Sequence, residues 1–161
     1  MDPVELLNLA VGLLRANAYG FLITTGDGQP RARLVQPVHV DDAATVSVGT
    51  SPRSRKVSDL RGVADAAFAV EDRDRFAYVT VSGTCSIIDD EAVRRERWTD
   101  GLAPFFPGGP TGDDFVIVEL CARRIEIMDF TQRVHPDPYG LVPAVITWDG
   151  SWRSVTADRL E

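Results

Sequence analysis

The chain has 161 residues, of which 44% are hydrophobic and 25% charged, with a net charge of −7 and a pI near 4.8. This length suits one domain with a buried core, and the composition excludes the fibrous and disordered classes. The acidic balance argues against a broad nucleic-acid or anionic-membrane interface, which needs an excess of Lys and Arg.

The N-terminal segment predicts an amphipathic helix. Asp2 is a suitable N-cap, Pro3 suits the first helical position, and Glu5 completes a capping box. The apolar residues that follow have helical spacing: Leu6, Leu9, Ala10, Leu13 and Leu14. We therefore expect a helix over about residues 3–17.

Strand-like segments separated by turns fill most of the chain after this helix. The predicted strands cover residues 21–25, 31–40, 45–48, 66–70, 76–88 and 115–129. Pro37 cannot donate a ladder hydrogen bond, so the second strand must be bulged or lie at an edge there. The last strand is a candidate for a bulge at Arg123-Arg124.

Two short helices interrupt the strands. Ser51-Pro52 or Ser54 can cap a helix that reaches about Arg61, and Asp89-Asp90 can cap another that runs through Trp98. This element order predicts a mainly β protein with flanking helices, built on a six-stranded antiparallel barrel that is closed or partly closed; an open sheet is the alternative. We expect residues 1–161 to form a single domain, with the barrel over about 20–129. The C-terminal extension covers about 130–161 and includes a possible strand at 144–148.

The segment 48–56, Val-Gly-Thr-Ser-Pro-Arg-Ser-Arg-Lys, carries the clearest chemical signal. Here a strand runs into a short helix through hydroxyls and three cations. Free N–H groups and the positive end of a helix dipole favour an anion, Arg adds forked donors, and Lys adds a compact charge. These features predict a site for a phosphate monoester. A solvated basic turn is the alternative.

Further motifs accompany this segment in a fixed order. They are Gly28-Gln29-Pro30, the strand Arg31-Ala32-Arg33-Leu34-Val35, Val81-Ser82-Gly83 at the end of 78–84, a Trp-bearing helix and a Phe-Phe-Pro-Gly-Gly loop. Together with 48–56, they resemble the pyridoxamine 5′-phosphate oxidase-like superfamily of FMN-binding split barrels, over about residues 13–129. Within it, the chain is most similar to the general stress protein type. The resemblance implies a split β-barrel that binds FMN.

The resemblance also implies which residues hold the cofactor. Arg33, Leu34 and Val35 are expected to line the isoalloxazine and ribityl side. Gly49 and Thr50 are expected beside the flavin near its phosphate. The phosphate itself is expected on the Ser-Arg-Lys segment and the preceding turn, at Ser51, Ser54, Arg55 and Lys56.

Departures from the oxidase pattern limit what the resemblance implies about activity. Tyr78 stands where the oxidase has a Gln that contacts the flavin, so the position carries over but its hydrogen bonding does not. The oxidase Lys after the Arg-x-Val segment is replaced within Gln36-Pro37-Val38, and the C-terminal Trp and Arg motif has no clear match. We therefore do not predict pyridoxine-phosphate oxidation; the sequence leaves the catalytic residues unassigned and predicts no metal site.

Three functions agree with these observations. The first is an FMN-dependent oxidoreductase that acts on a small-molecule redox substrate, the second uses a deazaflavin coenzyme instead, and the third is a non-catalytic flavin-binding stress or sensor protein. The resemblance implies a homodimer with flavin at the subunit interface. No nucleic acid or membrane is expected as a partner, since no apolar run approaches the roughly 20 residues that cross a bilayer. The N-terminus lacks a secretory pattern, so we expect a cytoplasmic protein.

Overall fold

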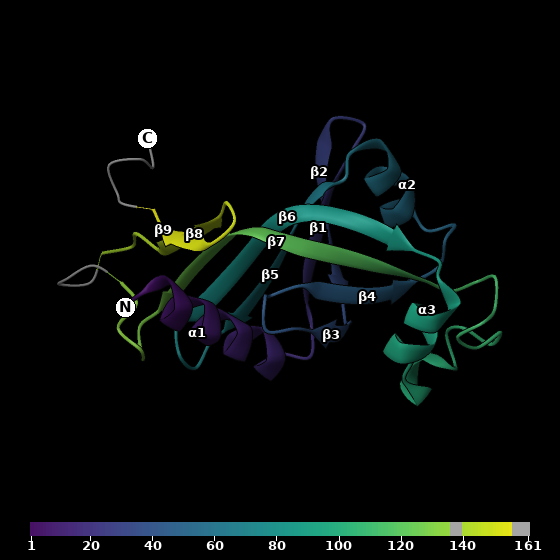
Figure 1. The fold of residues 1–161 in the computed structure, drawn as a ribbon, viewed down its shortest axis with the longest axis horizontal. Coiled ribbons are helices and arrows are strands. Elements are labelled where there is room, and N and C mark those ends of the chain that lie inside the picture. Colours follow the sequence, from purple (N-terminus) through teal and green to yellow (C-terminus); the bar gives the residue numbers. More distant parts are fainter. Residues whose placement is uncertain (136–139, 156–161) are drawn as a thin grey trace.

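The computed structural model describes residues 1–135 and 140–155, and within them it has one sheet of nine strands with helices around it (Figure 1). The elements in chain order are α1 (Pro3–Ala16), β1 (Gly20–Gly26), β2 (Gln29–Val35), β3 (Pro37–Val40), β4 (Val46–Thr50), α2 (Arg55–Gly62), β5 (Asp65–Asp72), β6 (Ala77–Ile88), α3 (Glu91–Arg97), the 3-10 turn η1 (Asp100–Leu102), β7 (Val116–Asp129), β8 (Ala144–Trp148) and β9 (Trp152–Ser154). The predicted class, mainly β with flanking helices, is confirmed.

Helix α1 begins where the capping box predicts. The Asp2 carboxylate accepts hydrogen bonds from the N–H groups of Val4 (2.8 Å) and Glu5 (2.9 Å), and the Glu5 carboxylate accepts one from the Asp2 N–H (2.8 Å). The helix lies along one side of the sheet, beside β5, β6 and β7 (Figure 1). Its apolar side packs into the main core and consists of Leu6, Ala10, Val11, Leu13 and Leu14.

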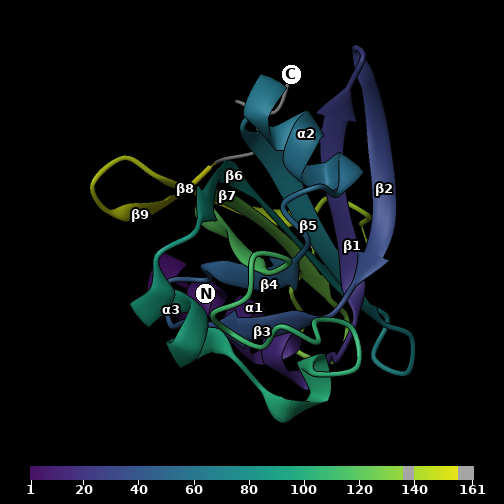
Figure 2. The same ribbon diagram turned by 90° about the vertical axis from the view of Figure 1, so that its right-hand side faces the viewer.

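The strand order explains how the sheet curves into a split barrel. The path is β2–β1–β5–β6–β7–β4–β3, with antiparallel pairing throughout, and β8 and β9 extend it beside β7. Two consecutive strands, β2 and β3, therefore lie at opposite edges of this path. Because Gln36 alone joins them, the two edges meet at that corner and diverge from it (Figure 2).

The sheet has more strands than the six expected. Residues 31–40, predicted as one strand, are divided at Gln36-Pro37 between β2 and β3. Pro37 lies on the edge strand, and the register with β4 shifts between Pro37 and His39, as its missing donor predicts. The tail adds β8, which was expected, and β9, which was not. Residues 136–139 and 156–161 of the predicted C-terminal extension lie outside the described part of the chain.

The bulge predicted in the last barrel strand is present. The pairing of β6 with β7 shifts between Ser82 and Gly83, opposite Arg123. A Cβ atom on Gly83 would overlap the carbonyl of Cys121, so this close approach requires glycine.

Among the described residues, no helix combines the length and apolar character needed to cross a bilayer.

Candidate functional site

The end of β4 and the start of α2 bring together hydroxyls and the lysine of the predicted anion motif. Ser54 is the N-cap of α2, and its Oγ accepts a hydrogen bond from the Val57 N–H at 3.4 Å. The buried Thr50 hydroxyl donates to Ser54 Oγ (3.3 Å) and accepts from Lys56 Nζ (2.9 Å). These bonds hold the Lys56 ammonium group at the end of β4.

Arg33 approaches helix α2 from strand β2 and contacts Asp59 on that helix. It pairs with the buried Leu22 across the β1–β2 hairpin, so its side chain lies on the inner side of the sheet. Its Nη1 donates to Thr24 Oγ1 at 2.6 Å, and its Nη2 lies 3.3 Å from Asp59 Oδ2. Strand alternation alone could not decide whether this face was solvated, because that depends on where α2 packs.

Asp59 is the carboxylate at the centre of these contacts, and sequence reasoning missed it. Its Oδ2 accepts a hydrogen bond from the Thr24 hydroxyl at 2.8 Å, and its Oδ1 accepts one from Arg31 Nη1 at 2.9 Å. The Thr24 hydroxyl and the charges of Arg31 and Arg33 lower the pKa of Asp59, although burial of the carboxylate opposes the shift. Asp59 is therefore ionised at neutral pH.

Lys56 carries a positive charge that no carboxylate among the described residues pairs with. The ion pairs of residues 1–135 and 140–155 include Arg31 and Arg33 with Asp59 but none with Lys56. Burial, and secondly the charge of Arg33, lower the pKa of Lys56. An anion placed against both cations would offset their repulsion and favour the charged form of Lys56. We call Arg33, Thr50, Ser54 and Lys56 the anion cluster.

The other predicted residues of the motif lie around the anion cluster. Arg55 is exposed at the start of α2 and makes no ion pair within the described residues. Ser51 lies in the turn before it, where its Oγ accepts a hydrogen bond from the Arg53 N–H at 3.2 Å. Gly49 lies on β4, and a Cβ atom there would come within 2.7 Å of the Phe115 ring, so the glycine makes room for that aromatic side chain.

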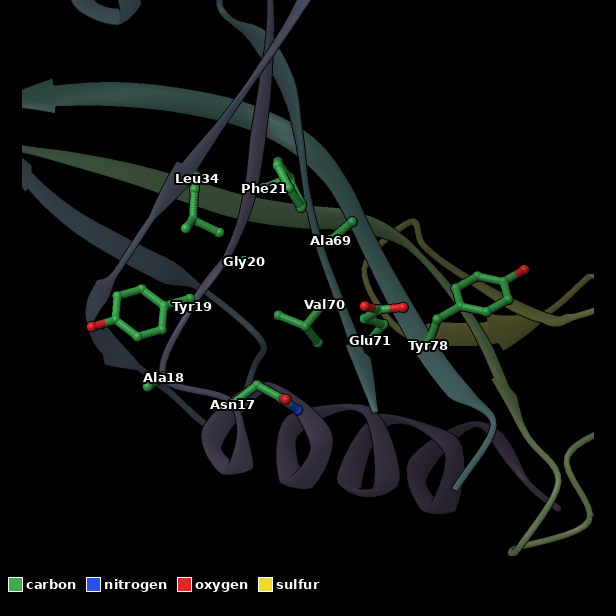
Figure 3. Close-up of a pocket in the computed structure, with 10 residues that line it drawn as sticks. All are labelled: Asn17, Ala18, Tyr19, Gly20, Phe21, Leu34, Ala69, Val70, Glu71 and Tyr78. Atoms are coloured by element: carbon green, nitrogen blue, oxygen red, sulfur yellow. The ribbon is translucent and has the colours of Figure 1, made fainter. Parts of the chain in front are cut away.

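Leu34 and Tyr78 belong to a different surface, a groove of about 580 Å³ on the outer side of the sheet (Figure 3). The groove is lined by Asn17, Ala18, Tyr19, Gly20, Phe21, Leu34, Ala69, Val70, Glu71 and Tyr78. Leu34 pairs with Phe21, and 59% and 51% of their surfaces are exposed. The Tyr78 hydroxyl donates to Glu126 Oε1 at 3.0 Å, and burial together with this carboxylate raises the pKa of Tyr78 to about 12.

The predicted residues 33–35 are thus divided between two sides of strand β2. Arg33 and Val35 face inward, where Arg33 joins the anion cluster and Val35 packs against the core. Leu34 faces outward into the groove. Successive side chains on a strand point to opposite faces, so the side chains of Arg33 and Leu34 meet different surroundings.

Comparison with known proteins decides which family the chain represents. The model of the family described as pyridoxamine 5′-phosphate oxidase like matches residues 9–141. The chain belongs to this family. No curated protein sequence matches it.

Several solved structures have a fold similar to that of this chain. A Clostridium acetobutylicum protein related to general stress protein 26 has 22% identity and a TM-score of 0.71, covering 80% of this chain and 91% of that one. A Nostoc punctiforme protein, described as pyridoxamine 5′-phosphate oxidase-related and FMN binding, has 15% identity and a TM-score of 0.70, covering 94% and 95%. A haem-binding protein from Mycobacterium smegmatis has 18% identity and a TM-score of 0.63, covering 94% of this chain and 58% of that one. At these identities, the similarity shows the fold.

Proposed function

We propose that this chain binds FMN with the phosphate on the anion cluster, and that it functions as an FMN-dependent oxidoreductase. The observation that carries the proposal is the half-buried Lys56 ammonium beside Arg33, with a lowered pKa and no carboxylate of its own among the described residues. When bound, FMN would supply the redox chemistry, while the chain binds, orients and shields it. No side-chain acid or base is assigned.

The residues around the anion cluster suit a phosphate monoester. Arg33 and Lys56 come from different elements, β2 and α2, and the Lys56 ammonium bonds to the Thr50 hydroxyl, which in turn bonds to Ser54 Oγ. Ser54 caps the N–H of Val57, which leaves the earlier N–H groups of the first turn for an anion. The exposed Arg55 adds a further cation at the same helix end. A phosphate dianion would therefore meet cations and donors from several directions.

The proposed functional form is a homodimer with flavin at the subunit interface. This is supported by apolar side chains on the outer side of β1 and β2 and just before β1, since Phe21, Leu34 and Tyr19 each remain more than half exposed. Contiguous exposed apolar surface of this kind is typical of interaction sites, and twofold self-association is the commonest way to cover it. Light scattering is expected to give the mass of a dimer, and Leu34→Glu is expected to shift it toward a monomer. A monomeric wild-type protein would contradict this part of the proposal.

The proposed phosphate site is tested by comparing the affinity for FMN with that for riboflavin, which has the same ring but no phosphate. We expect the wild-type protein to bind FMN at least about tenfold more tightly, since each charge-assisted contact is worth about 1.5–3 kcal/mol. The double variant Arg55→Ala/Lys56→Ala should lose this preference and retain its circular dichroism spectrum. Equal affinities of the wild-type protein for FMN and riboflavin would refute the proposed phosphate site.

The identity of the bound group and the activity require separate measurements. The visible spectrum of freshly purified protein distinguishes oxidised flavin from a deazaflavin, which absorbs at shorter wavelength, and from haem, which gives a Soret band. Stopped-flow reduction with NADH or NADPH then tests the enzyme. Rapid bleaching of the flavin supports an oxidoreductase, whereas no reduction by either donor favours a flavin-binding sensor.

A further inference from the structure

We infer that Asp59 is a positioning residue for phosphate binding, because its buried carboxylate holds the Arg33 guanidinium against α2, the helix that carries Lys56. The inference rests on the proposed function. Asp59 is not itself a phosphate ligand, since its charge would repel a phosphate dianion. Its role is to fix a cation that otherwise has a long, flexible side chain and a like-charged neighbour.

Thr24 and Asp59 together hold the two terminal nitrogens of the Arg33 guanidinium. Arg33 Nη1 donates to the Thr24 hydroxyl at 2.6 Å, and the same hydroxyl donates to Asp59 Oδ2 at 2.8 Å. Arg33 Nη2 lies 3.3 Å from that carboxylate oxygen. Donor groups of the guanidinium remain for an anion after these contacts are made. The arrangement fixes the direction of Arg33 without using up its hydrogen-bonding capacity.

The carboxylate is itself confined. Only 5% of the Asp59 side chain is exposed, and its other oxygen is held by Arg31 Nη1 at 2.9 Å. A Cβ atom on Gly26 would overlap Asp59 Oδ1 and the Arg31 guanidinium, so both groups lie directly against the backbone of β1. Little room remains for Asp59 to move.

The position of Asp59 on α2 links Arg33 to Lys56. Residues three apart on a helix lie on neighbouring parts of its surface, so Lys56 and Asp59 project toward the same side of α2. Burial is the larger cause of the lowered pKa of Lys56 and the charge of Arg33 is the second, as expected for like charges on neighbouring elements. Without the carboxylate, repulsion and side-chain entropy would both favour movement of Arg33 away from Lys56.

Asp59→Asn distinguishes a positioning role of Asp59 from a purely electrostatic one, because the two roles predict opposite changes in FMN affinity. Removing a negative charge near the site should tighten FMN binding if only long-range electrostatics matter. If Asp59 positions Arg33, the variant should bind FMN about tenfold more weakly, with riboflavin affinity unchanged. The matched control is Asp27→Asn, which removes the same charge from the exposed partner of Arg31. Asp27 has φ of 52°, which Asn also tolerates, so this variant should bind FMN like the wild-type protein.

Substitutions of Thr24 give a second, independent test that leaves the carboxylate in place. Thr24→Val keeps the shape of a buried side chain but removes the hydroxyl between Arg33 and Asp59, and it should weaken FMN binding by a similar factor. Thr24→Ser keeps the hydroxyl and should restore the affinity.

The possible results distinguish this inference from the proposed function. If folded Asp59→Asn or Thr24→Val binds FMN as tightly as the wild-type protein, or more tightly, while wild-type binding still prefers FMN to riboflavin, the positioning role is overturned and the phosphate site stands. If the wild-type protein has no such preference, the phosphate site fails and the positioning role fails with it.

Discussion

Replacing Lys56 with Met should weaken FMN binding without destabilising the protein that lacks FMN. The substitution keeps a long, flexible side chain but removes a half-buried charge that has no carboxylate partner among the described residues. A charge-assisted contact to phosphate is worth about 1.5–3 kcal/mol, so the Kd for FMN should rise roughly 10- to 150-fold. The free energy of unfolding without ligand should equal or exceed that of the wild-type protein, because the burial and repulsion that lower the Lys56 pKa disappear.

Quenching of FMN fluorescence measures the affinity, riboflavin serves as the ligand control, and urea unfolding measures stability. Arg61→Met is the matched protein control, since it removes an exposed positive charge from the last turn of the same helix. We expect it to leave FMN affinity close to that of the wild-type protein. The reasoning is refuted if Lys56→Met retains wild-type FMN affinity, or if Arg61→Met loses as much, because the effect would then be one of overall charge.

Three further measurements test Lys56, Asp59 and the glycine that packs against Asp59. FMN affinity should fall with rising pH, because the phosphate dianion binds the protonated form of Lys56. The fall should begin below pH 10.5, the ordinary pKa of lysine, since the pKa of Lys56 is lowered in the free protein. Riboflavin affinity, measured over the same pH range, should not fall in this way. The lowered pKa of Asp59 stabilises the folded protein at pH values above 3.8, the ordinary pKa of aspartate, and this stability is lost as the pH falls through the pKa of Asp59 in the folded state. The free energy of unfolding of Asp59→Asn should therefore depend less on pH in the acid range than that of the wild-type protein. Gly26→Ala should lower the melting temperature and weaken FMN binding, since a Cβ atom would displace Asp59 and Arg31; unchanged values of both would show that the contacts rearrange without cost.

Structural features that depend only on residues close together in the sequence were predictable. The Asp2 capping box, the bulge at Pro37 and the helix N-cap at Ser54, one of two candidates, all arise from local backbone chemistry. Phe76 is an exception. It was predicted to begin a strand, but β6 begins at Ala77, and Phe76 lies in the preceding turn with φ of 47°. A bulky residue in that conformation gives no warning in the sequence.

The missed part of the site depends on long-range geometry. Thr24, Arg31 and Asp59 looked like ordinary strand and helix residues, because their contacts need both the register of the β1–β2 hairpin and the docking of α2 against β1. The i, i+3 spacing of Lys56 and Asp59 was a visible signal that one face of α2 carries opposite charges. It could not show that Arg33 completes the cluster from another strand.

The anion cluster also joins parts of the barrel that backbone hydrogen bonds leave separate. Arg33 lies on β2, at one edge of the sheet path, whereas Thr50 ends β4, which is next to the opposite edge strand β3. A phosphate held by Arg33 and Lys56 would therefore bridge the two sides of the split, with Lys56 already bonded to Thr50 at 2.9 Å. A ligand that binds only the folded state raises its stability in proportion to ln(1 + [L]/Kd). Because riboflavin lacks the bridging group, FMN should slow hydrogen exchange in β2 and β4 more than riboflavin does at equal saturation, and equal protection by both ligands would argue against a bridge across the split.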